Sequence, residues 1–280
     1  MSTTPYNEPV GVAGCGAMGL PMARSLLAAG FDVWGFDVRA VDEFGDFRPR
    51  MIADPAEFAA RCPTVISVVR DIPQTLDLCF DAQALFAGVA RPRRLVVSST
   101  VSPRFLGKLA ARLPEGTELI DAPMSGAPVA AREARLTFMV GGAHTAVGEL
   151  MPVFGAMGRE IHHLGPLGAG MTVKVVNNFA AASSVVAVRH AIAAAKALGV
   201  APDLLTRVMA QSSGATWYGD NFAAIDWATE GYDPDNTIGI LEKDVTSFMD
   251  ALADLPEFED GALEETVIRN LRKLAPADSS

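Results

Sequence analysis

One lysine in an apolar segment is the residue of this sequence best suited to acid–base chemistry. Lys174 lies between Val173 and Val175, and Asn177 and Asn178 follow three and four residues later. In a helix, these spacings place either amide on the face of the lysine. An ammonium can donate a proton to a developing alkoxide, and the free amine can take the proton of an alcohol. The pattern fits alcohol–carbonyl chemistry, but the spacing alone fits a surface lysine equally well.

A glycine-rich turn is the second chemical feature, a candidate phosphate-binding loop. Residues Gly14, Cys15, Gly16, Ala17, Met18 and Gly19 have the spacing GxGxxG, directly after the apolar run Val10–Ala13. The first glycine would make a tight turn, the second would let a pyrophosphate approach, and the third would allow close helix–strand packing. N–H groups at the start of the following helix would then bind the phosphates. The loop predicts a dinucleotide site, and a plain strand–helix turn is the alternative.

An acidic residue at the end of the second apolar run indicates which dinucleotide is bound. Asp37 stands 23 residues after Gly14. A carboxylate there accepts hydrogen bonds from ribose hydroxyls and repels a 2′-phosphate, which favours NAD over NADP. Arg39 follows two residues later and is able to hold a 2′-phosphate, but we interpret it as a solvated loop residue.

These residues need a scaffold, and the sequence predicts a Rossmann-type, doubly wound α/β sheet for its first half. Short apolar runs alternate with helical stretches up to His163. Near-continuous apolar runs are typical of strands that are covered on both faces, and a βαβα order indicates a mostly parallel sheet. The predicted strands are Val10–Ala13, Phe31–Phe36, Val65–Val69, Leu95–Ser98, Glu118–Ile120 and Leu136–Val140, with helices that include Leu20–Ala29, Pro55–Arg61 and Pro103–Leu113.

The second half reads as an all-α domain. One long helix is predicted from Ala169 to Leu198, and only helical stretches follow it. We therefore predict a dinucleotide-binding domain over residues 1–165 and a helical substrate and oligomerisation domain over 166–280, linked by the long helix. The acidic stretch 246–280 is expected to be a solvated helical end.

Composition excludes several classes of protein. The chain of 280 residues has 33 acidic and 23 basic residues and a net charge of −10, which argues against nucleic-acid binding. Its three cysteines form no CxxC pair, so neither a disulfide framework nor a metal site is predicted, and the cytoplasm is the expected compartment. The uncharged stretch Val175–Val188 is too short and too polar for a bilayer span, so no membrane partner is expected.

Six ordered segments make the chain similar to the β-hydroxyacid dehydrogenase family, which includes 3-hydroxyisobutyrate dehydrogenase. The resemblance extends from about Val10 to Asp244. The segments that carry it are Gly14–Met22 (GCGAMGLPM), Ser99–Pro103 (STVSP), Asp121–Gly126 (DAPMSG), Phe138–Gly142 (FMVGG), Gly168–Asn178 (GAGMTVKVVNN) and Lys243-Asp244.

The resemblance implies roles for individual residues. Lys174 matches the catalytic lysine that relays the proton, and Asn178 matches a substrate-binding asparagine. Ser125 and Gly126 match the loop that holds the carboxylate of the substrate. Two further residues match positions at the cofactor, namely Thr100 near the nicotinamide and Lys243, which closes over cofactor and substrate.

The implied activity is hydride transfer between NAD and a small 3-hydroxy acid or its semialdehyde, by a homodimer or homotetramer. One alternative is an NADPH-dependent aldehyde or imine reductase of similar architecture. Imine reductases typically lack the lysine at the place of Lys174. The other alternative is a non-catalytic dinucleotide-binding protein.

The sequence departs from the family pattern in three places. Alanines replace glycines of the substrate loop at Ala127, Ala130 and Ala134, and Arg135 replaces a threonine. Asn236 stands where an aromatic residue usually lines the pocket, so either the pocket is more polar or the local alignment is wrong. The acidic end replaces glycine-punctuated helices, which puts the subunit contacts in doubt.

Overall fold

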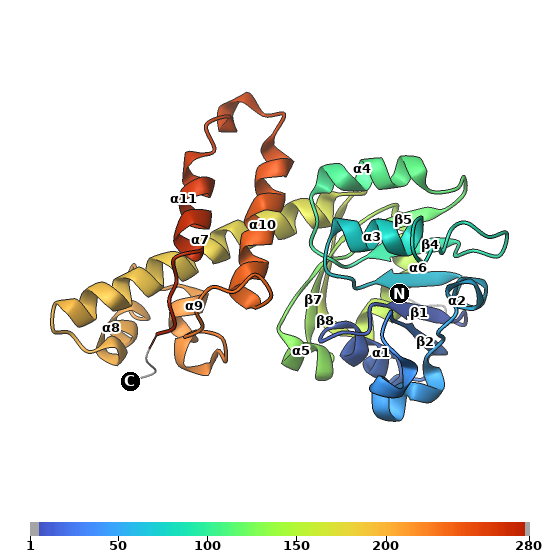
Figure 1. Cartoon of the computed structure of the whole chain (residues 1–280), viewed down its shortest axis with the longest axis horizontal. Helices are drawn as coiled ribbons and strands as arrows, with labels where there is room; N and C mark the ends of the chain where they lie inside the picture. Colours follow the sequence, from blue (N-terminus) through green and yellow to red (C-terminus); the bar gives the residue numbers. More distant parts are fainter. Residues whose placement is uncertain (1–5, 278–280) are drawn as a thin grey trace. The chain divides into compact units, whose positions relative to one another are not determined.

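The chain divides into two compact units within one long helix. The computed structural model (Figure 1) describes residues 6–277, and its two units are Met1–Lys174 and Val175–Ser280. The division therefore lies inside helix α7 (Ala169–Ala197), nine residues beyond the boundary at residue 165 that the sequence indicates. The domain limits 1–165 and 166–280 stay a prediction.

A parallel sheet organises the first unit, as predicted. Its five parallel strands lie in the order β2-β1-β3-β4-β5. The chain order reverses between β1 and β3, and ligands of such sheets bind at this point, outside the carboxyl ends of the strands. The strands are β1 (Val10–Ala13), β2 (Val33–Phe36), β3 (Thr64–Ser67), β4 (Arg94–Val97) and β5 (Glu118–Asp121).

Three further strands extend the sheet beyond β5. Strand β7 (Leu136–Gly141) pairs antiparallel with β5 and with the short β6 (Met124–Ser125). Strand β8 (Gly158–Gly165) pairs parallel with β7. Most of β8 is half-buried or exposed, so it lacks the apolar run by which the other strands are predicted.

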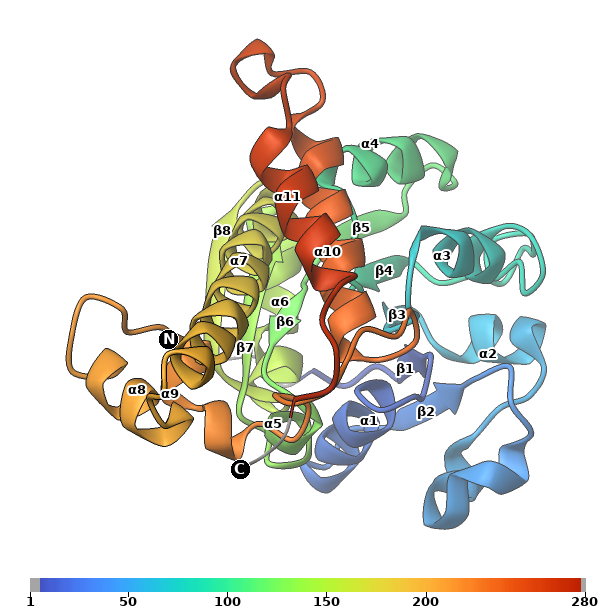
Figure 2. The same ribbon diagram turned by 60° about the vertical axis from the view of Figure 1, so that its left-hand side comes forward.

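Helices cover both faces of the sheet, which confirms the doubly wound architecture (Figures 1 and 2). One core lies under α1 (Gly19–Ala28), α5 (Pro128–Arg132) and α6 (His144–Gly155), where Leu26, Ala131 and Leu150 are buried. The other core lies under α2 (Pro55–Arg61), α3 (Ile72–Cys79) and α4 (Pro103–Arg112), with buried Phe58, Leu78 and Leu109. Each of α2, α3 and α4 has a side-chain N-cap, from Asp54, Asp71 and Ser102. A 3-10 segment, η1 (Val41–Arg50), follows β2.

The long helix α7 ends one residue before its predicted end. By length and composition alone it is apolar enough to cross a membrane, which differs from the expectation for Val175–Val188, and 33% of its most apolar stretch is buried. The core helix of a soluble protein passes the same test. Met171 belongs to the core of the first unit, whereas Ala182 and Val185 belong to that of the second.

The second unit is helical throughout its described part, since no strand occurs between residues 175 and 277. After α7 come α8 (Pro202–Met209), α9 (Trp217–Asp220), α10 (Thr237–Leu252) and α11 (Ala262–Leu271), with 3-10 turns at Phe222–Ala224 and Pro256–Phe258. Helices α10 and α11 lie side by side in both ribbon views.

The acidic end of the chain is helical as predicted, but the expectation that it is simply solvated is wrong. Val267 and Leu271 of α11 are buried in the core of the second unit. Buried Arg189 of α7 donates to the carbonyl oxygen of Ala275, and also to those of Ala228 and Glu230. The end of the described chain is therefore an integral part of the helical unit.

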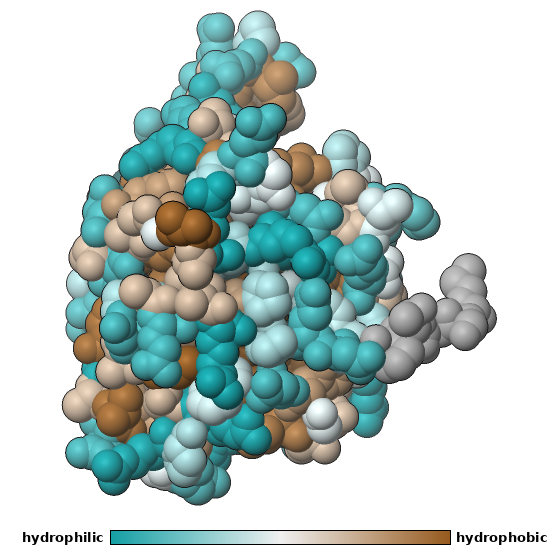
Figure 3. Space-filling view, turned by 90° about the vertical axis from the view of Figure 1, so that its right-hand side faces the viewer, coloured by the Kyte–Doolittle hydropathy of each residue, from teal (hydrophilic) through white to brown (hydrophobic). Residues whose placement is uncertain are grey.

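All three cysteines are free and buried. Burial raises the pKa of Cys15, Cys62 and Cys79 to about 12 each. The face of the molecule in Figure 3 is mostly hydrophilic, with hydrophobic residues in small separate patches. Scattered apolar residues of this kind are normal on protein surfaces.

Candidate functional site

The glycine-rich loop has the stereochemistry that a phosphate-binding turn needs. Gly14 has φ +89°, and a Cβ atom at this position would lie 2.8 Å from the carbonyl oxygen of Val68. A Cβ atom at Gly19 would overlap the carbonyl oxygen of Gly14. Beside Gly16, in contrast, no atom lies within 4 Å of the Cβ position. The first and third glycines are thus required by packing, whereas the second faces open space.

The open space beside Gly16 fits a bound pyrophosphate. Helix α1 begins directly after the loop, its N-cap Met18 makes no side-chain hydrogen bond, and its first turn contains no acidic residue. The partial positive charge of this helix end is therefore not neutralised by a neighbouring carboxylate in that turn. Cys15 is buried and Ala17 is exposed, so the loop presents its backbone rather than a reactive thiol.

Arg39 is an exposed loop residue, as the sequence indicates, but its guanidinium also makes specific contacts. Its Nε donates to Oδ1 of Asp37 at 3.0 Å, and its Nη2 donates to Oδ2 of Asp37 at 3.1 Å. The same Nη2 donates to the carbonyl oxygen of Cys15 at 2.9 Å. The guanidinium also lies over the ring of Phe44, 4.8 Å from its centroid. Arg39 thereby joins the end of β2 to the glycine-rich loop.

The side chain of Asp37 is only 9% exposed in this arrangement. Burial raises the pKa of Asp37, but hydrogen bonds from the side chain and backbone of Arg39 outweigh it, and the pKa lies below its ordinary value. The carboxylate is therefore ionised at neutral pH, as binding of ribose hydroxyls requires.

The loop after β4 is attached to the first turn of α7. Thr100 is half-buried, and its neighbour Val101 donates its backbone N–H to Sδ of Met171 at 3.4 Å. Met171 is itself fully buried. Thr100 therefore lies in a loop that is bonded to α7 at Met171, three residues before Lys174.

Lys174 lies on the buried side of α7. Its exposed fraction is 8%, whereas its apolar neighbours Val173 and Val176 are 41% and 49% exposed. The alternative of a surface lysine is thus wrong. Asn178 follows one helical turn later and is half-buried.

Ser125 and Gly126 lie at the start of the loop that is predicted to bind the substrate. Ser125 is in β6, paired with Thr137, and Gly126 is exposed with φ +123°. A Cβ atom at Gly126 would lie 2.8 Å from that of Ala130, so Ala130 packs beneath this glycine. Ala134 adopts φ +50°, a left-handed conformation that is costly for alanine. The loop therefore keeps a left-handed conformation at residue 134 although that residue is not glycine.

In the second unit, a carboxylate brings two predicted residues together. Asn178 donates from Nδ2 to Oδ2 of Asp244 at 2.5 Å, and Nζ of Lys243 lies 3.0 Å from Oδ1 of Asp244. Asp244 is only 3% exposed. Asn177 donates to Oδ1 of Asn178 at 3.1 Å. Sequence reasoning gave Asp244 no role of its own, although its place beside Lys243 in a family segment was the available signal.

Asn236 has a structural role that the sequence left open. Its Oδ1 accepts the backbone N–H of Gly239, and its Nδ2 donates to the carbonyl oxygen of Gly231. Asn236 is therefore the N-cap of α10, the helix that carries Lys243 and Asp244, and both ends of its amide are engaged.

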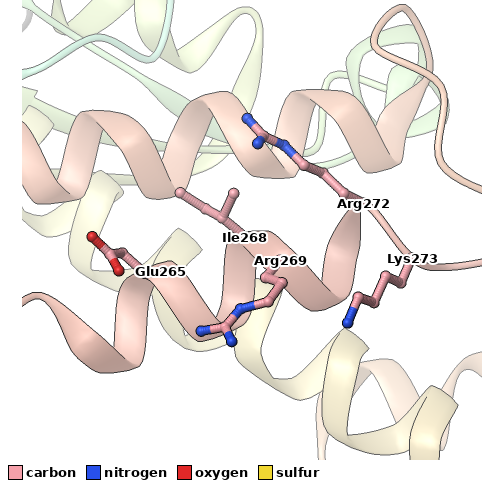
Figure 4. A pocket seen from close by; sticks show the side chains of 5 residues that line it. All are labelled: Glu265, Ile268, Arg269, Arg272 and Lys273. Atoms are coloured by element: carbon pink, nitrogen blue, oxygen red, sulfur yellow. The ribbon is translucent and has the colours of Figure 1, made fainter.

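A separate surface pocket of about 430 Å³ lies on α11 (Figure 4). Its lining residues are Glu265, Ile268, Arg269, Arg272 and Lys273. None of the predicted site residues belongs to it.

Known proteins similar to this chain share both of its units. Residues 9–165 match the family described as the NAD binding domain of 6-phosphogluconate dehydrogenase. Residues 168–268 match the family described as NAD-binding of NADP-dependent 3-hydroxyisobutyrate dehydrogenase. The boundary between the two matches, like that between the predicted domains, lies just before α7.

Two curated relatives and one solved structure show how far the similarity extends. L-threonate dehydrogenase of Cupriavidus necator is 34% identical over 86% of this chain and 82% of its own. NAD-dependent L-serine dehydrogenase of Pseudomonas aeruginosa is 36% identical over 75% of this chain and 72% of its own. The structure of Mycobacterium tuberculosis 3-hydroxyisobutyrate dehydrogenase with L-serine has a TM-score of 0.79 at 27% identity, and covers 97% of this chain and 96% of that one.

Proposed function

This chain belongs to the β-hydroxyacid dehydrogenase family, and from that premise we propose that it interconverts a small 3-hydroxy acid and its semialdehyde with Lys174 as general acid/base. It is an NAD-dependent oxidoreductase. The observation that carries the proposed mechanism is the burial of Lys174, an ammonium-bearing side chain on the otherwise apolar first turns of α7. Lysine is rarely buried in proteins, so its place on this face supports a function.

The residues divide the chemistry between them. NAD, when bound, accepts or returns the hydride. In the oxidation direction, the free amine of Lys174 takes the proton of the substrate hydroxyl; in the reduction direction, its ammonium gives the proton back. The hydroxyl of Ser125 and the backbone N–H of Gly126 would bind the substrate carboxylate. Asn178, oriented by its hydrogen bond to Asp244, would hold the substrate hydroxyl.

Cofactor binding is assigned to the glycine-rich loop and three side chains. The loop residues Gly14–Gly19 would contact the pyrophosphate, and Asp37 the adenosine ribose. Thr100 would lie near the nicotinamide, and Lys243 of α10 would also bind the cofactor.

Replacement of the lysine tests this mechanism. We expect Lys174→Ala to lower turnover about 10²- to 10⁴-fold, because it removes the proton relay. The Kd for NAD should stay within about twofold of that of the unaltered chain. The panel of substrates includes 3-hydroxyisobutyrate, L-serine and L-threonate, and reduced nicotinamide is followed by its absorbance.

The matched control is Lys108→Ala, which removes an exposed lysine of α4 and should change neither quantity. Near-normal turnover of Lys174→Ala would refute the mechanism. No turnover of any hydroxy acid by the unaltered chain, with NAD still bound, would favour a non-catalytic dinucleotide-binding protein.

An NADPH-dependent reductase is the second candidate, and Arg39 is the observation that favours it. Its guanidinium lies at the carboxylate of Asp37, where a 2′-phosphate would be placed. The ratio of kcat/KM for NADH and NADPH in reduction of a small aldehyde acid distinguishes the two candidates.

We further propose a homodimer or homotetramer in the cytoplasm. Leu198 directly after α7, Leu204 and Val208 one turn apart on α8, and Trp217 at the start of α9 are all exposed. Neighbouring exposed apolar residues of this size are typical of subunit interfaces. Light scattering after size-exclusion chromatography measures the oligomer, and Leu204→Asp should shift it to the monomer. The three free cysteines are consistent with a reducing compartment.

A further inference from the structure

Asp121 is a fully buried carboxylate whose partners are the backbone of another element. It is the last residue of β5 and has an exposed fraction of 0%. Its Oδ1 accepts the N–H of Gly168 at 2.7 Å, and its Oδ2 accepts the N–H of Met171 at 2.6 Å. These groups are the first N–H groups of α7, which have no partners within the helix itself.

The surroundings of Asp121 leave no room for a different arrangement. A Cβ atom at Gly141, which faces Asp121 across the sheet, would collide with Oδ1. A Cβ atom at Gly170 would overlap the carbonyl oxygen of Met139 and lie 3.0 Å from Oδ2. Two glycines, one on β7 and one on α7, thus allow the helix to start directly against the carboxylate.

The fixed turn leads directly to the buried lysine. Lys174 is three residues after Met171, so the two lie on neighbouring turns of the same helix face. Met171 is held twice, through its N–H by Asp121 and through its sulfur by the N–H of Val101. This helix end is held by the side chain of Asp121 at the end of β5 and by the backbone N–H of Val101 in the loop after β4, so it cannot rotate or fray without breaking buried hydrogen bonds. Breaking each costs about 1–3 kcal/mol.

We propose that Asp121 is a positioning residue for Lys174. It fixes the height and rotation of the first turn of α7 on the sheet, and thereby the place of the lysine amine relative to the carboxyl ends of the strands. This inference rests on the proposed function, because it assigns a purpose to the position of the general acid/base. Misplacement of a reacting group by about 1 Å costs about 10²-fold in rate.

Asp121→Asn tests the proposal, because it keeps the size of the side chain but turns one acceptor into a donor that faces an N–H. We expect kcat to fall about 10- to 100-fold while the Kd for NAD changes less than about twofold. Amide hydrogen exchange should become at least about tenfold faster at Gly168–Met171. Unchanged kcat together with unchanged exchange would overturn the proposal.

Asp54→Ala is the matched control for loss of a helix cap. Asp54 caps α2 through the N–H of Ala56, and α2 carries no predicted site residue. The control should lose about 1 kcal/mol of stability without losing kcat or the protection of Gly168–Met171. If it lowers kcat as much as Asp121→Asn does, general destabilisation explains the loss and the proposal fails.

A double variant separates this proposal from the proposed function. If Asp121 acts through Lys174, Asp121→Asn should lower the residual rate of Lys174→Ala less than about twofold. If Asp121→Asn lowers kcat by the same factor in Lys174→Ala as in the unaltered chain, the positioning role is overturned. High activity of the single variant Lys174→Ala would overturn the proposed mechanism instead. If Asp121→Asn does not fold, exchange in the unaltered chain still decides: the amides of Gly168 and Met171 must be as protected as those of β5, and fast exchange there contradicts the proposal.

Discussion

Asp37 and Asp121 occupy similar places at the carboxyl ends of parallel strands, but their surroundings are opposite. Asp37 follows β2 and is paired with the partly exposed guanidinium of Arg39. Asp121 ends β5 and is bound by backbone N–H groups in a cradle closed by glycines. The first carboxylate is only 9% exposed, but its partner is a side chain at the surface; the second carboxylate fixes a helix through buried backbone groups. Position at a strand end is therefore not enough to identify a binding residue, because the partners of the carboxylate decide its role.

The largest expected difference between the two carboxylates is in stability. Asp121→Ala leaves two buried N–H groups without their acceptor, so we expect the free energy of unfolding to fall by about 3 kcal/mol or more. Asp37→Ala removes a partly exposed ion pair and should cost less than about 1 kcal/mol. Chemical denaturation of both variants measures the difference. Equal losses would contradict the distinction between a structural and a ligand-facing carboxylate.

Gly170, beside Asp121, and Gly16, in the glycine-rich loop, should differ in the same sense. We expect Gly170→Ala to cost about 2 kcal/mol, because its Cβ atom would overlap the carbonyl oxygen of Met139. Gly16→Ala has open space and should change stability by less than about 0.5 kcal/mol. It should nevertheless weaken NAD binding about tenfold, since the methyl group occupies the space expected for the pyrophosphate. Thermal unfolding and calorimetric titration with NAD check the two halves of this prediction.

Substitution of Asp37 should affect NAD binding more than substitution of Asp121 does, which reverses their ranking by loss of stability. Asp37→Ala is expected to raise the Kd for NAD about tenfold, which is about 1.4 kcal/mol, and to reduce the preference over NADP. Titration with each cofactor gives both numbers. Arg39→Ala is the informative companion variant, because it leaves the carboxylate in place while removing its partner. Equal use of NAD and NADP by the unaltered chain would refute the role of Asp37.

The smallest expected effect is a difference in pH dependence. The pKa of Asp37 is lowered, so its contribution to stability is present above its unfolded pKa of about 4 and is lost as the pH falls through the lower folded value. Burial raises the pKa of Asp121 despite its backbone hydrogen bonds. Its titration therefore stabilises the fold below about pH 4, and that contribution is lost as the pH rises through the folded value.

The stability difference between the unaltered chain and Asp37→Asn should accordingly shrink on acidification. The difference for Asp121→Asn should grow. Denaturation curves between pH 3 and pH 7, about the range in which carboxyl groups titrate, compare the two slopes. Slopes of the same sign would show that the two environments do not differ electrostatically.

Repeated local patterns made much of the fold predictable. Apolar runs identified the five parallel strands, and the limits of α2 and the start of α7 were predicted to the residue. Strand β8 was missed because its side chains are mostly exposed. The end of the chain is predicted to be solvated because most of its residues are charged or polar. The apolar residues Val267 and Leu271 are four apart on α11 and are buried only when α11 packs in the folded second unit.

The candidate site was predictable where stereochemistry restricts the residue type. Gly14 and Gly19 have no room for a side chain, so their spacing carries the signal. The role of Arg39 depends on a contact with the carbonyl oxygen of Cys15, 24 residues away, and that of Asp121 on a contact with the start of α7. Neither contact has a local pattern, which is why the sequence predicts neither the contact of Arg39 with the glycine-rich loop nor that of Asp121 with α7.

The buried thiols have a practical consequence for labelling. A thiol with a pKa of about 12 is almost entirely protonated at neutral pH, and Cys15, Cys62 and Cys79 are also shielded from reagents by the fold. A cysteine introduced at an exposed place such as Val89 should therefore react with a maleimide dye long before the native ones. Site-specific attachment of a dye therefore needs no prior removal of the native cysteines. The slow reaction of the native cysteines would then report unfolding of the first unit.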